Sequence, residues 1–188
     1  MLAADFKTTL DACVLANQSV CDLFLRLAET PRLYVPVWSA EILDEVRRTH
    51  VDKLEWPTEL ADYWQSEVKK HFPEAAATGY TPFIPLAQNE SKDKHVLAVA
   101  ICANSALIIT FNLKHFPHAA LEPFGVKALH PAEYLITLYG MNPGVVVSKI
   151  EAMARAAKRT PEQMISLLGR SVPAFALHVA DALDWQLS

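Results

Sequence analysis

The sequence lacks the features that mark membrane-spanning, exported and disulfide-bonded proteins. No run of 18 apolar residues occurs in the 188-residue chain, which argues against a transmembrane helix. Residues 1–10 lack the basic start and long apolar centre of a signal peptide. The three cysteines are an odd number without CxxC spacing, which is typical of reduced thiols in the cytoplasm. We therefore expect a cytoplasmic protein that does not enter a membrane.

The chain also lacks an excess of basic residues. Its formal net charge of −4 argues against a protein that binds polyanions by bulk electrostatics alone. A local basic rim around an acidic centre stays compatible with this value. The hydrophobic fraction of 52% is enough for a sizeable core.

Hydrophobic periodicity predicts strands that alternate with helices over the first 140 residues. Short apolar or β-branched runs predict strands, and apolar positions at helical spacing predict helices between them. The segment YTPFIPLA at 80–87 is expected to be extended, outside a regular ladder because of its two prolines. This order predicts βαβ units and a parallel sheet, hence an α/β fold. The expected strands are 6–10, 32–37, 106–110 and 126–129, and the expected helices are 14–28, 40–49, 57–72, 91–104 and 131–140, the last with Gly140 as its C-cap.

Beyond residue 140 the pattern indicates helices only. Thr160, followed by proline, glutamate and Gln163, has the form of a capping box that starts a helix. We predict a domain at 1–140 and a helical C-terminal extension at 141–188. An apolar side formed by Val145, Val146, Ile150 and Met153 could pack on the sheet layer or form a dimer or partner surface, and periodicity does not decide between these.

Polar residues follow two of the predicted strands and open two of the helices. Asp11 and Asn112 come just after strands, and ligands of parallel sheets bind outside the carboxyl ends of the strands. Glu45 lies on the helix that begins after Ser39, and Asp93 lies in the first turn of another. Converging carboxylates are costly unless a cation neutralises them, and hard oxygen ligands suit Mg²⁺ or Mn²⁺.

Each of these residues has an ordinary structural interpretation when taken alone. Asp11 could be a solvated strand end or a helix cap, and Asp93 a first-turn acid stabilised by the helix dipole. Glu45 could pair with a neighbouring arginine, and Asn112 could be a turn residue. Only the four positions together favour a site.

The four positions lie within segments that resemble PIN-domain ribonucleases, in particular VapC-type toxins. The matching segments are TTLDACVLAN (8–17), WSAEILDEVRR (38–48), KDKHVLAVAICANSALIITFNLKHFP (92–117) and GVKALHPAEYL (125–135). The aspartate that ends the first strand in the family matches Asp11. The glutamate of its second helix matches Glu45, the aspartate that opens a later helix matches Asp93, and its T-x-D or T-x-N ending matches Thr110 and Asn112.

The resemblance implies a three-layer α/β/α fold with a central parallel sheet and a metal-dependent endoribonuclease. In that reading Asp11, Glu45 and Asp93 hold Mg²⁺ or Mn²⁺, which activates water for attack on an RNA phosphodiester. Thr110 and Asn112 orient water or a carboxylate around the metal. The expected partners are RNA, a cognate antitoxin protein and a second copy of the chain in a homodimer. Basic side chains that could hold the RNA backbone, or could simply be solvated, are Arg47, Arg48, Lys92, Lys94, Lys114 and His115.

The sequence departs from the family at the fourth acid. Many relatives carry it at the position of Asn112 or three residues later, where this chain has His115. This leaves open a catalytically weak or inactive PIN module that binds RNA or protein. Two other readings have less support. A haloacid-dehalogenase phosphatase needs a second acid where this chain has Cys13, and the sequence places no histidine beside Cys13 for a cysteine hydrolase.

Overall fold

The computed structural model describes residues 5–186, and within this range the chain forms two compact units. The sheet unit consists of residues 5–16 and 35–129. The helical unit consists of residues 17–34 and 130–186 in the described part. The predicted boundary at residue 140 stays a prediction.

The sheet unit contains a parallel sheet of four strands. Its strands are β1 (Lys7–Leu10), β2 (Val35–Val37), β3 (Leu107–Ile109) and β4 (Lys127–Leu129), in the spatial order β2-β1-β3-β4. Leu10, Ile108 and Ile109 are fully buried, as expected for central strands covered by other elements. The α/β class with a central parallel sheet is therefore confirmed. Because the strands are parallel, their carboxyl ends share one edge.

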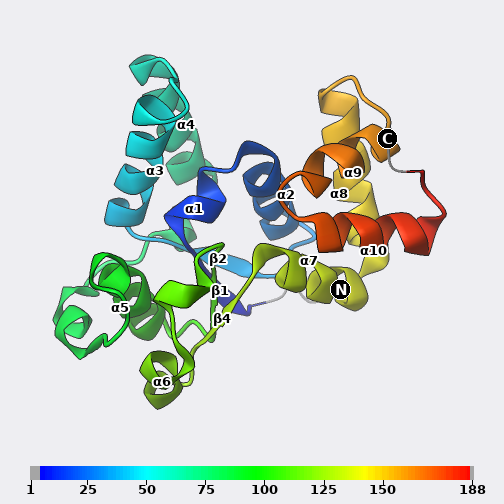
Figure 1. The fold of residues 1–188 in the computed structure, drawn as a ribbon. Helices are drawn as coiled ribbons and strands as arrows, with labels where there is room; N and C mark the ends of the chain where they lie inside the picture. The colour runs from blue at the N-terminus through cyan, green and yellow to red at the C-terminus, as the bar shows by residue number, and fades with distance from the viewer. Residues whose placement is uncertain (1–4, 187–188) are drawn as a thin grey trace. The chain divides into compact units, whose positions relative to one another are not determined.

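Five helices of the sheet unit are α1 (Ala12–Leu15), α3 (Ala40–Asp52), α4 (Thr58–His71), α5 (Lys94–Ala103) and α6 (His118–Leu121). Helix α5 packs on β1, β2 and β3, and helix α3 packs against α1 and α4 (Figure 1). Ser39 caps α3 as predicted, since its hydroxyl oxygen accepts a hydrogen bond from Ile42 N at 3.2 Å. This cap fixes the start of the helix that carries Glu45.

Short 3₁₀ turns connect these elements: η1 (Pro73–Ala75), η2 (Thr81–Leu86), η3 (Ser91–Asp93), η4 (Leu113–His115) and η5 (Glu122–Phe124). The predicted extended segment at 80–87 is wrong, because η2 occupies most of it. Proline at the start of a helical turn costs no hydrogen bond, and the fixed φ of proline suits that turn. The prolines that barred this segment from a sheet are thus equally compatible with a tight helix.

The helical unit contains α2 (Gln18–Ala28), α7 (Pro131–Met141), α8 (Pro143–Ala156), α9 (Pro161–Gly169) and α10 (Pro173–Leu183). The helical character of the chain after residue 140 is confirmed. Phe24, Tyr34 and Tyr134 pack together in this unit with ring centroids 5.7–6.2 Å apart. The Tyr34 hydroxyl donates to Phe24 O at 2.8 Å, so its buried polar end is satisfied.

Three predictions about helix ends in the helical unit can be compared with the structure. The capping box of Thr160 and Gln163 is present as predicted. The prediction of Gly140 as a C-cap is wrong, because α7 continues through Met141 and Asn142 takes that place. The predicted helix at 14–28 is interrupted at residues 16–17, where Asn17 caps α2 by accepting a hydrogen bond from Val20 N at 3.3 Å.

The apolar side of α8 is covered within the helical unit. Helix α8 packs against α2, α7 and α9, and Val146, Ile150 and Met153 are buried there. These three side chains stabilise the unit, so they are not free to form a partner surface. Among the described residues, no helix combines the length and apolarity needed to span a bilayer.

Candidate active site

The carboxyl ends of β1 and β3 bring Asp11 and Thr110 together. Leu10 pairs with Ile109 in the sheet, so the residues that follow them are neighbours. Asp11 N donates to Ile109 O at 3.1 Å, and Thr110 Oγ1 donates to Asp11 Oδ2 at 2.6 Å. Both side chains are buried. The strand register therefore holds the Asp11 carboxylate in one place.

Cys13 and Asn112 extend this hydrogen-bond network. The Cys13 thiol donates to Asp11 Oδ2 at 3.1 Å, and Phe111 N donates to Cys13 Sγ at 3.3 Å. Asn112 N donates to Thr110 Oγ1 at 2.9 Å. Burial, with the charge of Asp11 as a second cause, raises the pKa of Cys13 to about 12. The thiol thus stays protonated at neutral pH, which argues against the cysteine-hydrolase reading.

Asp93 lies at the junction of η3 and α5 and contacts His115. The Asp93 side chain makes no helix-cap hydrogen bond, although the residue occupies the N-cap position. Its Oδ2 lies 2.8 Å from His115 Nδ1. Burial raises the pKa of Asp93, and the negative charge of Asp11 raises it further, whereas His115 and Lys92 lower it. The carboxylates of Asp11 and Asp93 are therefore close enough to repel each other.

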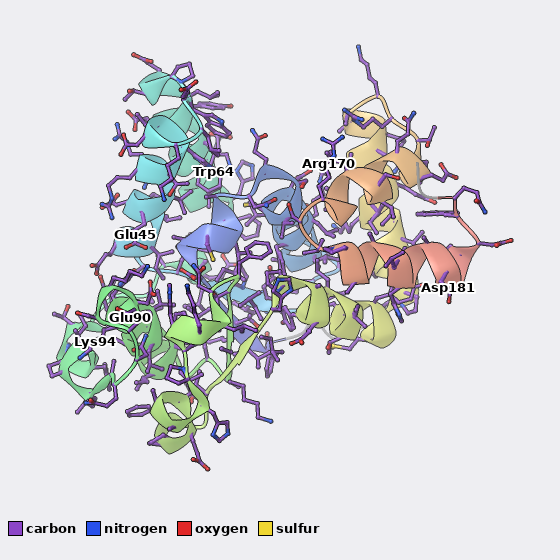
Figure 2. All side chains as sticks on the ribbon, viewed as in Figure 1. Glu45, Trp64, Glu90, Lys94, Arg170 and Asp181 are labelled. Atoms are coloured by element: carbon purple, nitrogen blue, oxygen red, sulfur yellow. The ribbon has the colours of Figure 1, made fainter. Side chains whose placement is uncertain are left out.

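Glu45 projects from the N-terminal half of α3 and faces a histidine of α5. Its Oε2 lies 3.6 Å from His95 Nε2, and its Oε1 lies 3.7 Å from Arg48 (Figure 2 labels Glu45). Burial lowers the pKa of the His95 imidazole, but its side-chain contact with Glu45, together with the charges of Glu45, Glu41 and Asp11, outweighs burial and raises the pKa overall. The charges of both Glu45 and Asp11 therefore act on His95.

The predicted RNA-binding side chains have different surroundings. Arg47 forms an ion pair with Asp62 of α4, with Nε 2.5 Å from Oδ1, so its guanidinium is already engaged. Lys92 and Lys114 are exposed, and Lys94 is half-buried. His115 is drawn inward to Asp93 rather than outward to solvent. Of the six, His115 is integrated most closely into the acidic site.

Asp11, Glu45 and Asp93 are the acidic residues that could hold a divalent cation, which would keep part of its water shell. Among residues 5–186, no three His, Cys, Asp or Glu side chains lie close enough together to form a complete metal cage. Magnesium is usually held by one or two carboxylates, with water and substrate phosphate supplying the other ligands. Asp93 Oδ2 is buried, and its contact with His115 lacks good hydrogen-bond geometry. The negative charge of Asp11 also repels the Asp93 carboxylate. A cation would satisfy this oxygen and offset the repulsion.

Three residues beside the predicted acids were not expected from the sequence. Cys13 bonds Asp11, His95 faces Glu45, and Asn89 precedes the turn that carries Asp93. Both polar atoms of the buried Asn89 carboxamide lack hydrogen-bond partners. The helical spacing of His95 and its position two residues after Asp93 were visible in the sequence, but nothing in the sequence indicated that Glu45 would face it.

Comparison with known proteins gives one curated relative. Over 105 residues, 54% of this chain, the sequence is 39% identical to a protein of Mycobacterium tuberculosis (strain ATCC 25618 / H37Rv) described as "Putative ribonuclease VapC50". The match covers 62% of that protein, so this chain spans less than two thirds of its length. No family model matches the chain, and no solved structure matches it. The resemblance to VapC-type PIN-domain proteins is confirmed by this relative.

Proposed function

We propose that this chain is a metal-dependent endoribonuclease that hydrolyses RNA phosphodiesters and serves as the toxin of a toxin–antitoxin pair. The observation that carries the proposal is the position of Asp11 at the carboxyl end of a parallel sheet, where Thr110 fixes its carboxylate and its charge raises the pKa of Asp93. The name of the mycobacterial relative supports the same chemistry. We place the activity in the cytoplasm, where the RNA substrate is available.

Asp11, Glu45 and Asp93 would hold Mg²⁺ or Mn²⁺. When bound, such a cation supplies positive charge that activates water and stabilises the charge developing on a phosphodiester. Thr110 fixes the Asp11 carboxylate through its 2.6 Å hydrogen bond, and the Asn112 backbone fixes the Thr110 hydroxyl in turn. The protein thus presents one acidic oxygen in a defined position before substrate arrives.

Charge neutralisation tests the nuclease. Asp11→Asn keeps the size of the side chain but removes the negative charge, so we expect RNA cleavage with Mg²⁺ or Mn²⁺ to fall about 100-fold or more. Glu45→Gln should lower cleavage too. Asp44→Asn is the matched control, because Asp44 is exposed on the same helix and bonds Gln65. Equal cleavage by wild type and Asp11→Asn across RNA substrates would refute the nuclease.

The second candidate is a PIN module that is weakly active or inactive and acts by binding RNA or protein. It is favoured by the contacts that the acids already make within the protein. Thr110 and Cys13 donate hydrogen bonds to Asp11, and His95 and His115 lie close to Glu45 and Asp93, respectively. Calorimetry with Mg²⁺ separates the two candidates. An active site binds the ion in a manner that depends on Asp93, whereas an inactive module gives the same heat in wild type and in Asp93→Asn.

The toxin role has its own test. Expression of the chain should arrest growth, and co-expression of the neighbouring gene product should restore it if that product is the antitoxin. The Asp11→Asn variant should be harmless, because toxicity in this proposal comes from RNA cleavage. Growth arrest by Asp11→Asn as strong as that by wild type would separate toxicity from the site. Sedimentation of the purified chain would test the proposed homodimer.

A further inference from the structure

Buried polar atoms without hydrogen bonds are concentrated in the segment 89–95, which contains Asp93, and at His115, which contacts Asp93. Among the described residues, nine buried side-chain nitrogen or oxygen atoms lack a hydrogen-bond partner, and five of them belong to Asn89, Asp93, His95 and His115. Each such atom costs about 1–3 kcal/mol when it stays unsatisfied. Their concentration in one region, rather than an even spread, points to something that binds there.

The closest two of these atoms are Asp93 Oδ2 and His115 Nδ1. They lie 2.8 Å apart, yet neither takes part in a hydrogen bond of acceptable geometry. Two buried atoms that face each other at this distance share a positive charge, which either a proton on the imidazole or a bound metal ion can supply. A metal ion in place of that proton would be held by one carboxylate oxygen and one imidazole nitrogen of the protein.

The backbone around the pair is already fixed by hydrogen bonds. His115 N donates to Asn112 O at 2.9 Å, and His115 O accepts from Glu90 N at 3.1 Å. Asp93 N donates to Glu90 O at 2.9 Å. Glu90 therefore ties the turn that carries His115 to the turn that carries Asp93. This arrangement keeps the oxygen and the nitrogen adjacent without an ion, as a preformed site requires.

We propose that His115 is a nitrogen ligand in the metal site and that, with Asp93, it gives the site a preference for first-row transition ions such as Mn²⁺ over Mg²⁺. The inference rests on the proposed function for the presence of a metal. Imidazole nitrogen binds transition ions well, whereas Mg²⁺ prefers oxygen ligands and water. The remaining positions around the ion would be filled by water and by substrate phosphate.

Pulsed electron paramagnetic resonance on the full chain loaded with Mn²⁺ tests the nitrogen ligand directly. Wild type should show ¹⁴N modulation from a bound imidazole, and Mg²⁺ should compete poorly for the ion. His115→Asp replaces nitrogen by oxygen, so the modulation should vanish and the preference for Mn²⁺ over Mg²⁺ should fall roughly tenfold. His118→Asp is the matched control, since His118 is exposed three residues later. This control should retain the nitrogen signal.

Three further results decide the proposal. His95→Gln should keep the modulation, and its loss in that variant would assign the nitrogen to His95 and overturn the role of His115. Mn²⁺ bound in an Asp93-dependent manner without any ¹⁴N modulation would also overturn it, while the proposed nuclease stands. No Mn²⁺ binding by folded wild type would refute both. If His115→Asp fails to fold, His115→Ala replaces it in the test, with its folding checked by circular dichroism. This variant should also lose the ¹⁴N modulation.

Discussion

The two halves of the acidic site differ in how completely their polar atoms are paired. On the side of β1 and β3, Asp11 Oδ2 accepts hydrogen bonds from Thr110 and Cys13, and Thr110 accepts one from Asn112 N. On the side of the α5 turn, Asp93 Oδ2 and His115 Nδ1 lack hydrogen bonds of good geometry. We call the side of β1 and β3, whose polar atoms are hydrogen-bonded within the protein, the complete half of the site. The side of the α5 turn, with its unpaired polar atoms, is the incomplete half.

This difference follows from the elements that carry each half. Parallel strands fix the positions of the residues directly after them, so Asp11 and Thr110 meet through the same register that builds the sheet. Asp93 and His115 lie in short 3₁₀ turns, whose side chains are less constrained by a ladder. We infer that the sheet side positions a fixed carboxylate and that the turn side receives the ligand. The predictions below test this division, from the largest expected effect to the smallest.

The thiol of Cys13 should be almost inert in the folded protein. Burial and then the charge of Asp11 raise its pKa from the ordinary 9.0 to about 12, which lowers the thiolate fraction at pH 8 about a thousandfold. Alkylation of native protein by iodoacetamide, followed by peptide mass spectrometry, should leave Cys13 unmodified, whereas protein unfolded in guanidinium should react readily. Equal labelling of Cys13 in both states would contradict a closed network at Asp11.

Removal of the Thr110 hydroxyl should destabilise the complete half. Thr110→Val leaves Asp11 Oδ2 and Asn112 N without a hydroxyl partner, and this should lower the free energy of unfolding by about 1–3 kcal/mol. Thr9→Val is the matched control on β1, because the Thr9 hydroxyl is buried without a hydrogen bond. That change should be neutral or stabilising. Urea titration of both variants measures the difference, and equal losses would show that the hydroxyl network has no special role.

The contrast between the halves also explains which features the sequence predicted. Apolar strand runs followed by polar residues indicated a parallel sheet with Asp11 and Thr110 at one edge, since strand order and register obey general rules. The contacts of His95 with Glu45 and of His115 with Asp93 depend on turn geometry and on how α3 faces α5. Propensity and periodicity do not encode such contacts, so the partners of two acids could not be read from the sequence.

The 3₁₀ turns show the same limit at the level of secondary structure. Pro82 and Pro85 fix φ at values that suit an extended chain and a helical turn alike, so the segment 80–87 could be assigned either way. The structure selects the turn, and this segment packs against α5. Local sequence leaves such a choice to tertiary contacts, whereas the capping residues Ser39 and Thr160 act through their own side chains and were predicted correctly.

A carboxylate at position 112 should add a ligand for a divalent cation to the complete half. Asn112→Asp adds a negative charge next to Asp11 and Thr110, so divalent-ion affinity measured by calorimetry should rise about tenfold. Without metal the added charge should raise the pKa of Asp93 further above its ordinary value. A carboxyl with a raised pKa in the fold loses stability as pH rises through the interval between its ordinary and raised values.

The melting temperature of Asn112→Asp should therefore fall more than that of wild type between pH 4 and pH 7.5 without metal, and added Mn²⁺ should reverse the loss. Asn104→Asp is the control, because Asn104 lies at the C-terminus of α5 with a φ of 56°, a conformation that aspartate tolerates. It adds the same charge away from the acids. An unchanged affinity in Asn112→Asp, or an equal gain in Asn104→Asp, would place residue 112 outside the metal site.

The smallest effect on stability is expected at Asn89, whose buried side chain can be replaced without loss of a hydrogen bond. Both amide atoms of this buried side chain lack partners, so Asn89→Leu removes unsatisfied polar groups and should change the free energy of unfolding by less than about 1 kcal/mol, in the stabilising direction. Asn17→Leu is the comparison, since Asn17 caps α2 and donates to Ser171 at 2.8 Å, and its loss should cost about 1 kcal/mol. Thermal unfolding of the two variants gives the answer. A destabilised Asn89→Leu would mean that the carboxamide is paired in the free protein, and Asn89 would then not belong to the unpaired atoms of the turn side.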